Sequence, residues 1–225
     1  TSLGVDKIKF SGRLSLLFFP LVDKLPVVSA IQYSFVNPPL LDFNFTGALS
    51  IVQKSGLHKS ILNIVRTIVN GMMVLPTHMN IILEPNIDLL DIYQAPLGIV
   101  RLKVVEGRGF NVRKKMKMVK DIPDCYCKIR FGADGTWKTT VQKDNVTPRW
   151  NEHHDYLYSD RDQVVYVDVY DENSGLVDAD KFLGRSHVTI GEILDANRSI
   201  ELELEDKSSK RTGYYVTLSC KINKF

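Results

Sequence analysis

The last 130 or so residues consist almost entirely of short stretches with the two-residue periodicity of β-strands, and no other feature constrains the fold as strongly. Turn-forming residues separate these stretches. Because successive side chains on a strand point to opposite faces, such a series predicts an antiparallel β-sandwich. The candidate strands are eight, at residues 99–105, 126–131, 136–142, 153–157, 163–170, 184–190, 200–204 and 214–222.

The first 95 residues also contain strand patterns, but here they are longer and more apolar. Residues 5–16 are expected to form a single half-buried strand with its apolar side chains on one face. The side chains assigned to that face are Ile8, Phe10, Leu14 and Leu16. Three further strands are expected at 31–35, 41–45 and 79–83, each with apolar residues at every second position.

One helix interrupts these strands. Residues 57–75 carry apolar side chains at i, i+3 and i+4 spacing, which predicts an amphipathic helix that Pro76 ends. The fold class expected from both halves is an α+β domain at residues 1–95 followed by an all-β domain at residues 96–225. The boundary is placed at Pro96, where the helical signal has ended.

Composition excludes several classes of protein. The apolar fraction is 44%, the charged fraction 24% and the formal net charge +3, all ordinary for a globular chain. The longest apolar stretch, residues 14–22, is too short to span a bilayer. Three cysteines without framework spacing predict reduced thiols rather than disulfides. The first residues read like the interior of a strand, so we expect the chain to be a fragment, with any membrane anchor upstream.

The most specific motif is Asn-Val-Thr-Pro-Arg-Trp-Asn-Glu at residues 145–152. It resembles the N-x-x-P-x-W-N-E signature of C2 domains. Three further stretches resemble C2 segments in the same order, at 102–110, 123–126 and 169–185. The resemblance covers residues 98–225 and implies a C2 sandwich of eight strands.

The C2 resemblance also bears on calcium, which these domains often bind through carboxylates of two loops. It implies that Asp124 and Asp171 match two of the usual ligands, while Asn173 replaces a third. The last position is Lys181, although Asp180 is adjacent. Calcium requires six to eight oxygen ligands, so this set predicts a weak or absent site. No cofactor is expected to be required, and calcium is left as a doubtful one.

Basic charge is concentrated where calcium ligands are lacking. The expected membrane-binding residues of this segment are Arg113, Lys114, Lys115, Met116, Lys117, Met118 and Lys120. A basic residue near an anionic leaflet contributes about 1 kcal/mol, so the segment is expected to bind anionic phospholipid largely without calcium. A second basic face is expected at Lys128, Arg130 and Lys138. Nucleic acid is not expected as a partner, because no nucleic-acid fold matches.

The order of motifs along the whole chain carries a second resemblance. Leu25-Pro26, Ile-Gln-Tyr-Ser-Phe at 31–35, Pro-Pro-Leu-Leu-Asp-Phe at 38–43 and a helix ending in Val-Leu-Pro at 74–76 precede the C2 motifs. This order is similar to that of the extended synaptotagmins and tricalbins. The resemblance implies that residues 1–95 are the C-terminal half of an SMP module, a TULIP-like barrel that takes up glycerolipid acyl chains.

The resemblance implies a lipid-binding or lipid-transfer protein that tethers membranes at contact sites. The implied location is the cytosolic face of contacts between endoplasmic reticulum and plasma membrane. A further implied partner is a second copy of the chain, bound through the SMP module. The expected lipid-lining residues are Ile8, Phe10, Leu14, Leu16, Ile31, Tyr33, Phe35, Phe43, Phe45, Ile68 and Met72, for each of which core packing is an equal alternative. The other hypothesis is a C2 adaptor for trafficking that carries no lipid. No enzyme is expected, because the sequence lacks a G-x-S-x-G elbow, a Gly-rich phosphate loop and an H-E-x-x-H motif.

Overall fold

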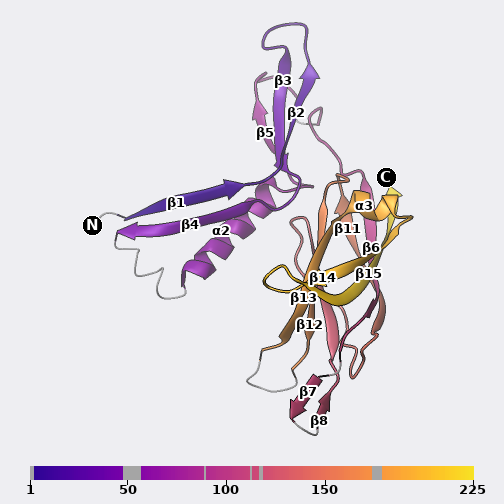
Figure 1. The fold of residues 1–225 in the computed structure, drawn as a ribbon. Coiled ribbons are helices and arrows are strands. Elements are labelled where there is room, and N and C mark those ends of the chain that lie inside the picture. Colours follow the sequence, from indigo (N-terminus) through magenta and orange to yellow (C-terminus); the bar gives the residue numbers. More distant parts are fainter. Residues whose placement is uncertain (1–2, 48–56, 89, 112, 117–118, 174–178) are drawn as a thin grey trace. The chain divides into compact units, whose positions relative to one another are not determined.

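The structure is a computed structural model that describes residues 3–47, 57–88, 90–111, 113–116, 119–173 and 179–225. The chain divides into two compact units, residues 1–95 and 96–225, and each is considered by itself. Figure 1 shows strands and one long helix in the first unit, and mostly strands in the second. In the described ranges no helix is long and apolar enough to cross a bilayer.

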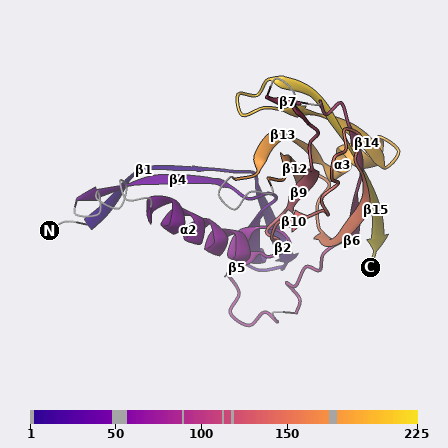
Figure 2. The same ribbon diagram turned by 90° about the horizontal axis from the view of Figure 1, so that it is seen from below.

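One half of the first unit is a two-stranded ribbon with a helix beside it. Strand β1 (Leu3–Ser11) pairs antiparallel with β4 (Leu40–Gly47). Helix α2 (Leu57–Met73) lies along β4 in both views (Figures 1 and 2). Leu62 of the helix packs with Leu41 and Phe43 of the strand in a small buried cluster.

The other half is a three-stranded antiparallel sheet in the order β2 (Leu14–Leu21), β3 (Val28–Phe35) and β5 (Met79–Ile82). The single strand expected at residues 5–16 is therefore wrong, because β1 and β2 belong to different sheets. The chain turns at Gly12, where an added Cβ would lie 2.9 Å from the Phe35 ring and 3.0 Å from Pro39 Cβ. Periodicity alone does not show this close approach, which only glycine permits.

The central strand β3 turns its polar side inward. The sequence places Ile31, Tyr33 and Phe35 on the apolar face of this strand. In the structure Phe35 is buried and Ile31 and Tyr33 are half-buried, whereas Gln32, on the polar face, is only 3% exposed and Ser34 is also buried. Gln32 Nε2 donates to Asn80 Oδ1 at 2.9 Å and to the carbonyl oxygen of Ile92 at 3.1 Å. Its two amide protons are thereby satisfied, while its buried Oε1 has no partner among the described residues, so these bonds offset only part of the free-energy cost of burying this polar side chain.

The second unit is a β-sandwich whose strands form one hydrogen-bonded series, β10-β9-β12-β13-β14-β15-β6-β11. The ladder pairing between β13 and β14 is limited to Arg185 and Glu205, and at this point the series passes from one four-stranded layer to the other. The bounds are β6 (Gly98–Arg108), β9 (Cys125–Phe131), β10 (Trp137–Lys138), β11 (Arg149–Tyr158), β12 (Val164–Asp171), β13 (Lys181–Thr189), β14 (Ser199–Glu205) and β15 (Arg211–Lys224).

Three features of this unit differ from the sequence analysis. The strand expected at 136–142 is only two residues long, followed by an isolated bridge between Cys125 and Gln142. A short helix, α3 (Ile190–Asp195), begins at a capping box in which Thr189 and Glu192 bond reciprocally, a signal present in the sequence as T-x-x-E. A small hairpin of β7 (Arg113–Met116) and β8 (Val119–Asp121) extends from the sandwich.

The sandwich core is close-packed around Trp150, the tryptophan of the most specific motif. Its ring is buried, and an added Cβ on Gly107 would lie 3.2 Å from it and 2.7 Å from the Phe110 ring. The three cysteines are buried and free, as predicted.

This packing predicts the effect of one methyl group. Gly107→Ala is expected to lower the free energy of unfolding by about 1–3 kcal/mol, because the methyl group overpacks the Trp150 and Phe110 rings. Chemical denaturation followed by tryptophan fluorescence measures this, since Trp137 and Trp150 are the only tryptophans and both lie in the sandwich. Gly135→Ala is the control, because its added Cβ would meet no atom within 4 Å. Equal stabilities of the two variants would contradict the packing described.

Candidate functional site

One face of the three-stranded sheet is apolar and turned to solvent. Across the sheet, Leu16 is opposite Tyr33 and Tyr33 is opposite Met79, while Phe18, Ile31 and Ile81 form the next row. Directly opposed residues in antiparallel strands share a face. We call the surface formed by Leu14, Leu16, Phe18, Ile31, Tyr33, Met79 and Ile81 the apolar sheet face. Leu16 is 52% and Phe18 54% exposed, which is unusual for adjacent large apolar side chains on a strand.

Helix α2 carries a second exposed apolar surface. Its packed side holds Leu62, Val65 and Val69, together with Arg66, which donates to the carbonyl oxygen of Leu41 at 2.8 Å and 3.1 Å. Beside that side runs a stripe of exposed residues at helical spacing, Leu57, Ile64, Ile68 and Met72, which we call the helix stripe. Thus only part of the apolar face predicted for this helix is used for packing.

The expected lipid-lining residues divide into three groups. Six are exposed, namely Ile8, Phe10, Leu14, Leu16, Ile68 and Met72. Three are half-buried, namely Ile31, Tyr33 and Phe45. Phe35 and Phe43 are buried, and they contact Phe10 and Phe45 respectively through edge-on ring pairs. Phe18, Ile64 and Ile81 belong to the same surfaces but were missed, although Phe18 continues the alternation of Leu14 and Leu16.

The basic segment forms a hairpin at one end of the sandwich (Figure 1). Strands β7 and β8 hold Arg113, Lys114, Lys115, Met116 and Lys120, and the description of this hairpin is confined to its backbone. Lys114 is paired with Lys120 in the register. Lys117 and Met118 lie outside the described residues. The topology therefore brings the four cationic residues of these two strands onto one short projection.

The second basic face lies on β9 and β10. Lys128 Nζ is 4.6 Å from the centroid of the Tyr170 ring, and Lys138 Nζ is 3.8 Å from that of Tyr126. Arg130 pairs with Asp168 at 3.2 Å, and Lys138 pairs with Glu172 at the same distance. The three cations predicted here thus do lie together, but each already forms an ion pair or a cation–π contact with neighbouring residues.

The loop carboxylates considered for calcium are held by donors of the protein itself. Asp171 Oδ1 accepts from the backbone N–H of Asp124 at 2.8 Å, and Asp124 Oδ1 accepts from that of Asp144 at 2.7 Å. Asp180 accepts from the Tyr126 hydroxyl at 2.6 Å and from the backbone N–H of Asn173 at 3.2 Å. In the part of the chain that the structure describes, no three acidic, histidine or cysteine residues are grouped as metal ligands.

The electrostatics of Asp180 follow from these contacts. The Tyr126 hydrogen bond is the largest of the effects that lower the Asp180 pKa, followed by the Asn173 N–H and the charges of Lys138 and Lys128. Each of these stabilises the carboxylate without a bound metal ion. The negative charge of Asp180 is therefore balanced by neighbouring groups of the protein.

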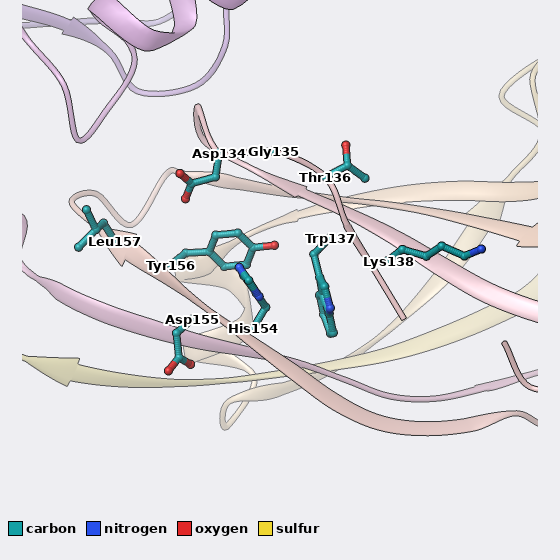
Figure 3. Close-up of a pocket in the computed structure, with 9 residues that line it drawn as sticks. All are labelled: Asp134, Gly135, Thr136, Trp137, Lys138, His154, Asp155, Tyr156 and Leu157. Carbon is teal, nitrogen blue, oxygen red and sulfur yellow. The ribbon is translucent and has the colours of Figure 1, made fainter. Parts of the chain in front are cut away.

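A shallow cavity of about 560 Å³ lies between β10 and β11, the two edges of the strand series (Figure 3). The rings of Trp137, His154 and Tyr156 follow one another along it, with centroids 5.8 Å and 4.7 Å apart. The ammonium of Lys138 points away from these rings (Figure 3). His154 stacks on Trp137, and Asp155 forms an ion pair with Arg101 at 2.7 Å.

The balance of charge around Asp180 gives a pH prediction. Tyr126→Phe removes the hydroxyl donor, and the free energy of unfolding is expected to fall by about 1 kcal/mol near neutral pH. A lowered carboxyl pKa stabilises the fold above the ordinary value of 3.8, and this stabilisation disappears as the pH falls through the lowered pKa. The difference between variant and parent should therefore shrink below pH 3.8, as measured by denaturation across pH.

Tyr170→Phe is the matched control. The Tyr170 ring stacks on the Tyr126 ring at 5.5 Å, but the hydroxyl that donates to Asp180 is that of Tyr126, so this variant keeps the hydrogen bond. A pH-independent loss in Tyr126→Phe would contradict the assignment.

Fold and surfaces together define a class: a C2-like sandwich that follows a module of strands and one helix with exposed apolar surfaces. The C2 domain family model matches residues 98–212, and that of the synaptotagmin-like mitochondrial-lipid-binding domain matches residues 1–84. The chain belongs to the C2 domain family, and its pair of domains makes it an extended-synaptotagmin-like protein.

Individual relatives agree with this assignment. Extended synaptotagmin-1 of Homo sapiens is 28% identical over 201 residues, covering 86% of this chain and 18% of the relative. Extended synaptotagmin-3 of Homo sapiens is 26% identical over 212 residues, covering 92% and 23%. The solved structure of the SMP domain and two C2 domains of extended synaptotagmin 2 has a TM-score of 0.62 at 24% identity and covers 99% of this chain and 45% of that one. The chain thus spans about a fifth of the length of these curated relatives.

Proposed function

We propose that the first unit binds glycerolipid acyl chains and transfers them between membranes at contact sites, while the C2 domain docks on anionic phospholipid largely without calcium. The observation that supports lipid binding is the orientation of the central strand β3, whose polar side faces the interior. Gln32 and Ser34 occupy the buried side, so Ile31 and Tyr33 lie on the exposed apolar sheet face.

Transfer energetics support acyl chains as the ligand of this face. Shielding one methylene group from water is worth about 0.8 kcal/mol, so a lipid in water has a strong tendency to cover its chains. The apolar sheet face and the helix stripe offer rows of exposed Leu, Ile, Phe and Met side chains, and these rows carry no charged residue. Elongated apolar surfaces of this kind match the shape of an extended chain better than that of a compact polar ligand.

The charge distribution supports docking of the C2 domain without calcium. The β7–β8 hairpin carries only one acidic residue, Asp121, among its basic ones. Near an anionic leaflet each Lys or Arg contributes about 1 kcal/mol, and salt screens the attraction. At the same end Tyr126, Lys138 and backbone N–H groups already stabilise the loop carboxylates, so a divalent cation adds little.

The location we propose is the cytosolic face of contacts between the endoplasmic reticulum and another membrane, as the extended-synaptotagmin resemblance implies. A homodimer through the first unit stays a prediction of the same resemblance. A C2 adaptor without lipid would have the same docking surface, so lipid uptake is the property that separates the two functions.

Lipid uptake is expected to depend on the apolar sheet face. Leu16→Asn combined with Phe18→Asn should reduce uptake of a fluorescent phospholipid from detergent micelles by about tenfold, because both side chains are half exposed where the acyl chain would lie. Leu40→Asn is the control, a similarly exposed leucine on β4. Undiminished uptake in the double variant would contradict the assignment of lipid binding to this face, and no uptake by the parent chain would favour the adaptor.

Docking is expected to follow the basic hairpin and the salt concentration. Binding to vesicles containing phosphatidylserine should weaken with salt and persist in chelator. Reversal of Lys114, Lys115 and Lys117 to Glu should weaken it by about a hundredfold or more, from three contributions of about 1 kcal/mol each. Reversing the exposed residues Lys210, Lys221 and Lys224 makes the same change in net charge and should have a much smaller effect. Strict dependence on calcium would refute the proposal.

A further inference from the structure

The turn between β2 and β3 exposes apolar side chains that belong neither to the apolar sheet face nor to the helix stripe. Leu25 is 87% exposed, Leu21 is 74% exposed, and Val27 is also exposed. Figure 1 shows this turn at the free end of the three-stranded sheet, away from β1, β4 and α2 of the same unit. Three large apolar side chains at one protruding turn are costly in water and indicate a contact with an apolar partner.

Hydrogen bonds within the turn fix its conformation. The backbone N–H of Val22 donates to the carbonyl oxygen of Val27 at 2.8 Å, and that of Val27 donates to the carbonyl oxygen of Lys24 at 2.7 Å. Lys24 also forms an ion pair with Glu84 at 3.4 Å, which ties the turn to the segment that follows β5. These contacts hold Leu21 and Leu25 outward rather than allowing them to fold back on the sheet.

The turn joins the two strands that carry most of the apolar sheet face. Leu21 is the last residue of β2 and pairs with Val28 at the start of β3. Because side chains alternate along a strand, Leu21 and Val28 lie on the face opposite to that of Phe18 and Ile31. The turn therefore adds exposed apolar side chains at the end of the sheet, one register position beyond the apolar sheet face.

Size and charge favour a bilayer over a protein as the partner. A fully buried apolar side chain covers roughly 60–120 Å² by transfer energetics, so three cover far less than the ~800 Å² per partner of a stable protein interface. The turn is convex, and its only charged residues, Asp23 and Lys24, have opposite signs. A fluid, uncharged hydrocarbon layer accepts such a tip without a matching pocket.

We propose that the β2–β3 turn inserts Leu21, Leu25 and Val27 into the donor or acceptor bilayer and is the point at which lipid passes between membrane and apolar sheet face. The inference rests on the proposed lipid binding of that face. It adds a second membrane contact, apolar and independent of the basic hairpin.

The test uses the full chain with an environment-sensitive dye at a single introduced thiol. The three native cysteines are buried, so the thiol of Leu25→Cys should label selectively. With vesicles of phosphatidylcholine and phosphatidylserine, the dye at position 25 should brighten severalfold and be quenched by a nitroxide on the acyl chain. The same dye on Leu90→Cys, a leucine 79% exposed in the same unit, should stay as in water. No change at position 25, or an equal change at both positions, would overturn the inference.

A functional variant separates this inference from the lipid-binding proposal. Leu25→Asp should still take up fluorescent phospholipid from detergent micelles, whereas its extraction of the same lipid from vesicles should fall by about tenfold or more, because a carboxylate resists insertion. If the parent chain neither takes up the lipid from micelles nor extracts it from vesicles, lipid binding itself is contradicted. Dimerisation through the turn, seen as a mass in sedimentation that halves in Leu25→Asp without vesicles, would assign the turn to a second copy and overturn the proposal.

Discussion

The hydrogen bonds of Gln32 determine which face of the first unit meets solvent. Its amide donates to Asn80 and to the carbonyl oxygen of Ile92, and this pairing holds Gln32 in the interior. Because side chains alternate along a strand, burying Gln32 and Ser34 turns Ile31 and Tyr33 outward. A slip of one residue would reverse the two faces and remove the apolar surface on which lipid binding depends.

The two units differ in the kind of surface that they expose to solvent. The first leaves apolar surface uncovered, and we propose that a lipid or a membrane covers it during function. The second buries its apolar residues in a close-packed sandwich and collects charge in its loops. There the Tyr126 hydroxyl donates to Asp180 and Lys138 pairs with Glu172, and we propose that the basic hairpin faces an anionic surface.

Much of this arrangement is predictable from sequence. The C2 motifs led to Trp150, which is buried as its large apolar ring requires, and the helical spacing at 57–75 led to α2. The break at Gly12 and the inward position of Gln32 were not predictable, because both depend on partners distant in sequence, Phe35 with Pro39 and Asn80 with Ile92. Alternation shows that a strand has an apolar side, but not which side the rest of the fold will cover.

The central claim is that the exposed apolar surface of the first unit is a lipid-binding surface. Native mass spectrometry of the intact 225-residue chain, purified from cells without detergent, tests it most directly. The account predicts a population heavier than the polypeptide by the mass of a glycerophospholipid, which organic extraction releases and identifies. A single species at the polypeptide mass, from preparations that still bind anionic vesicles, would contradict it.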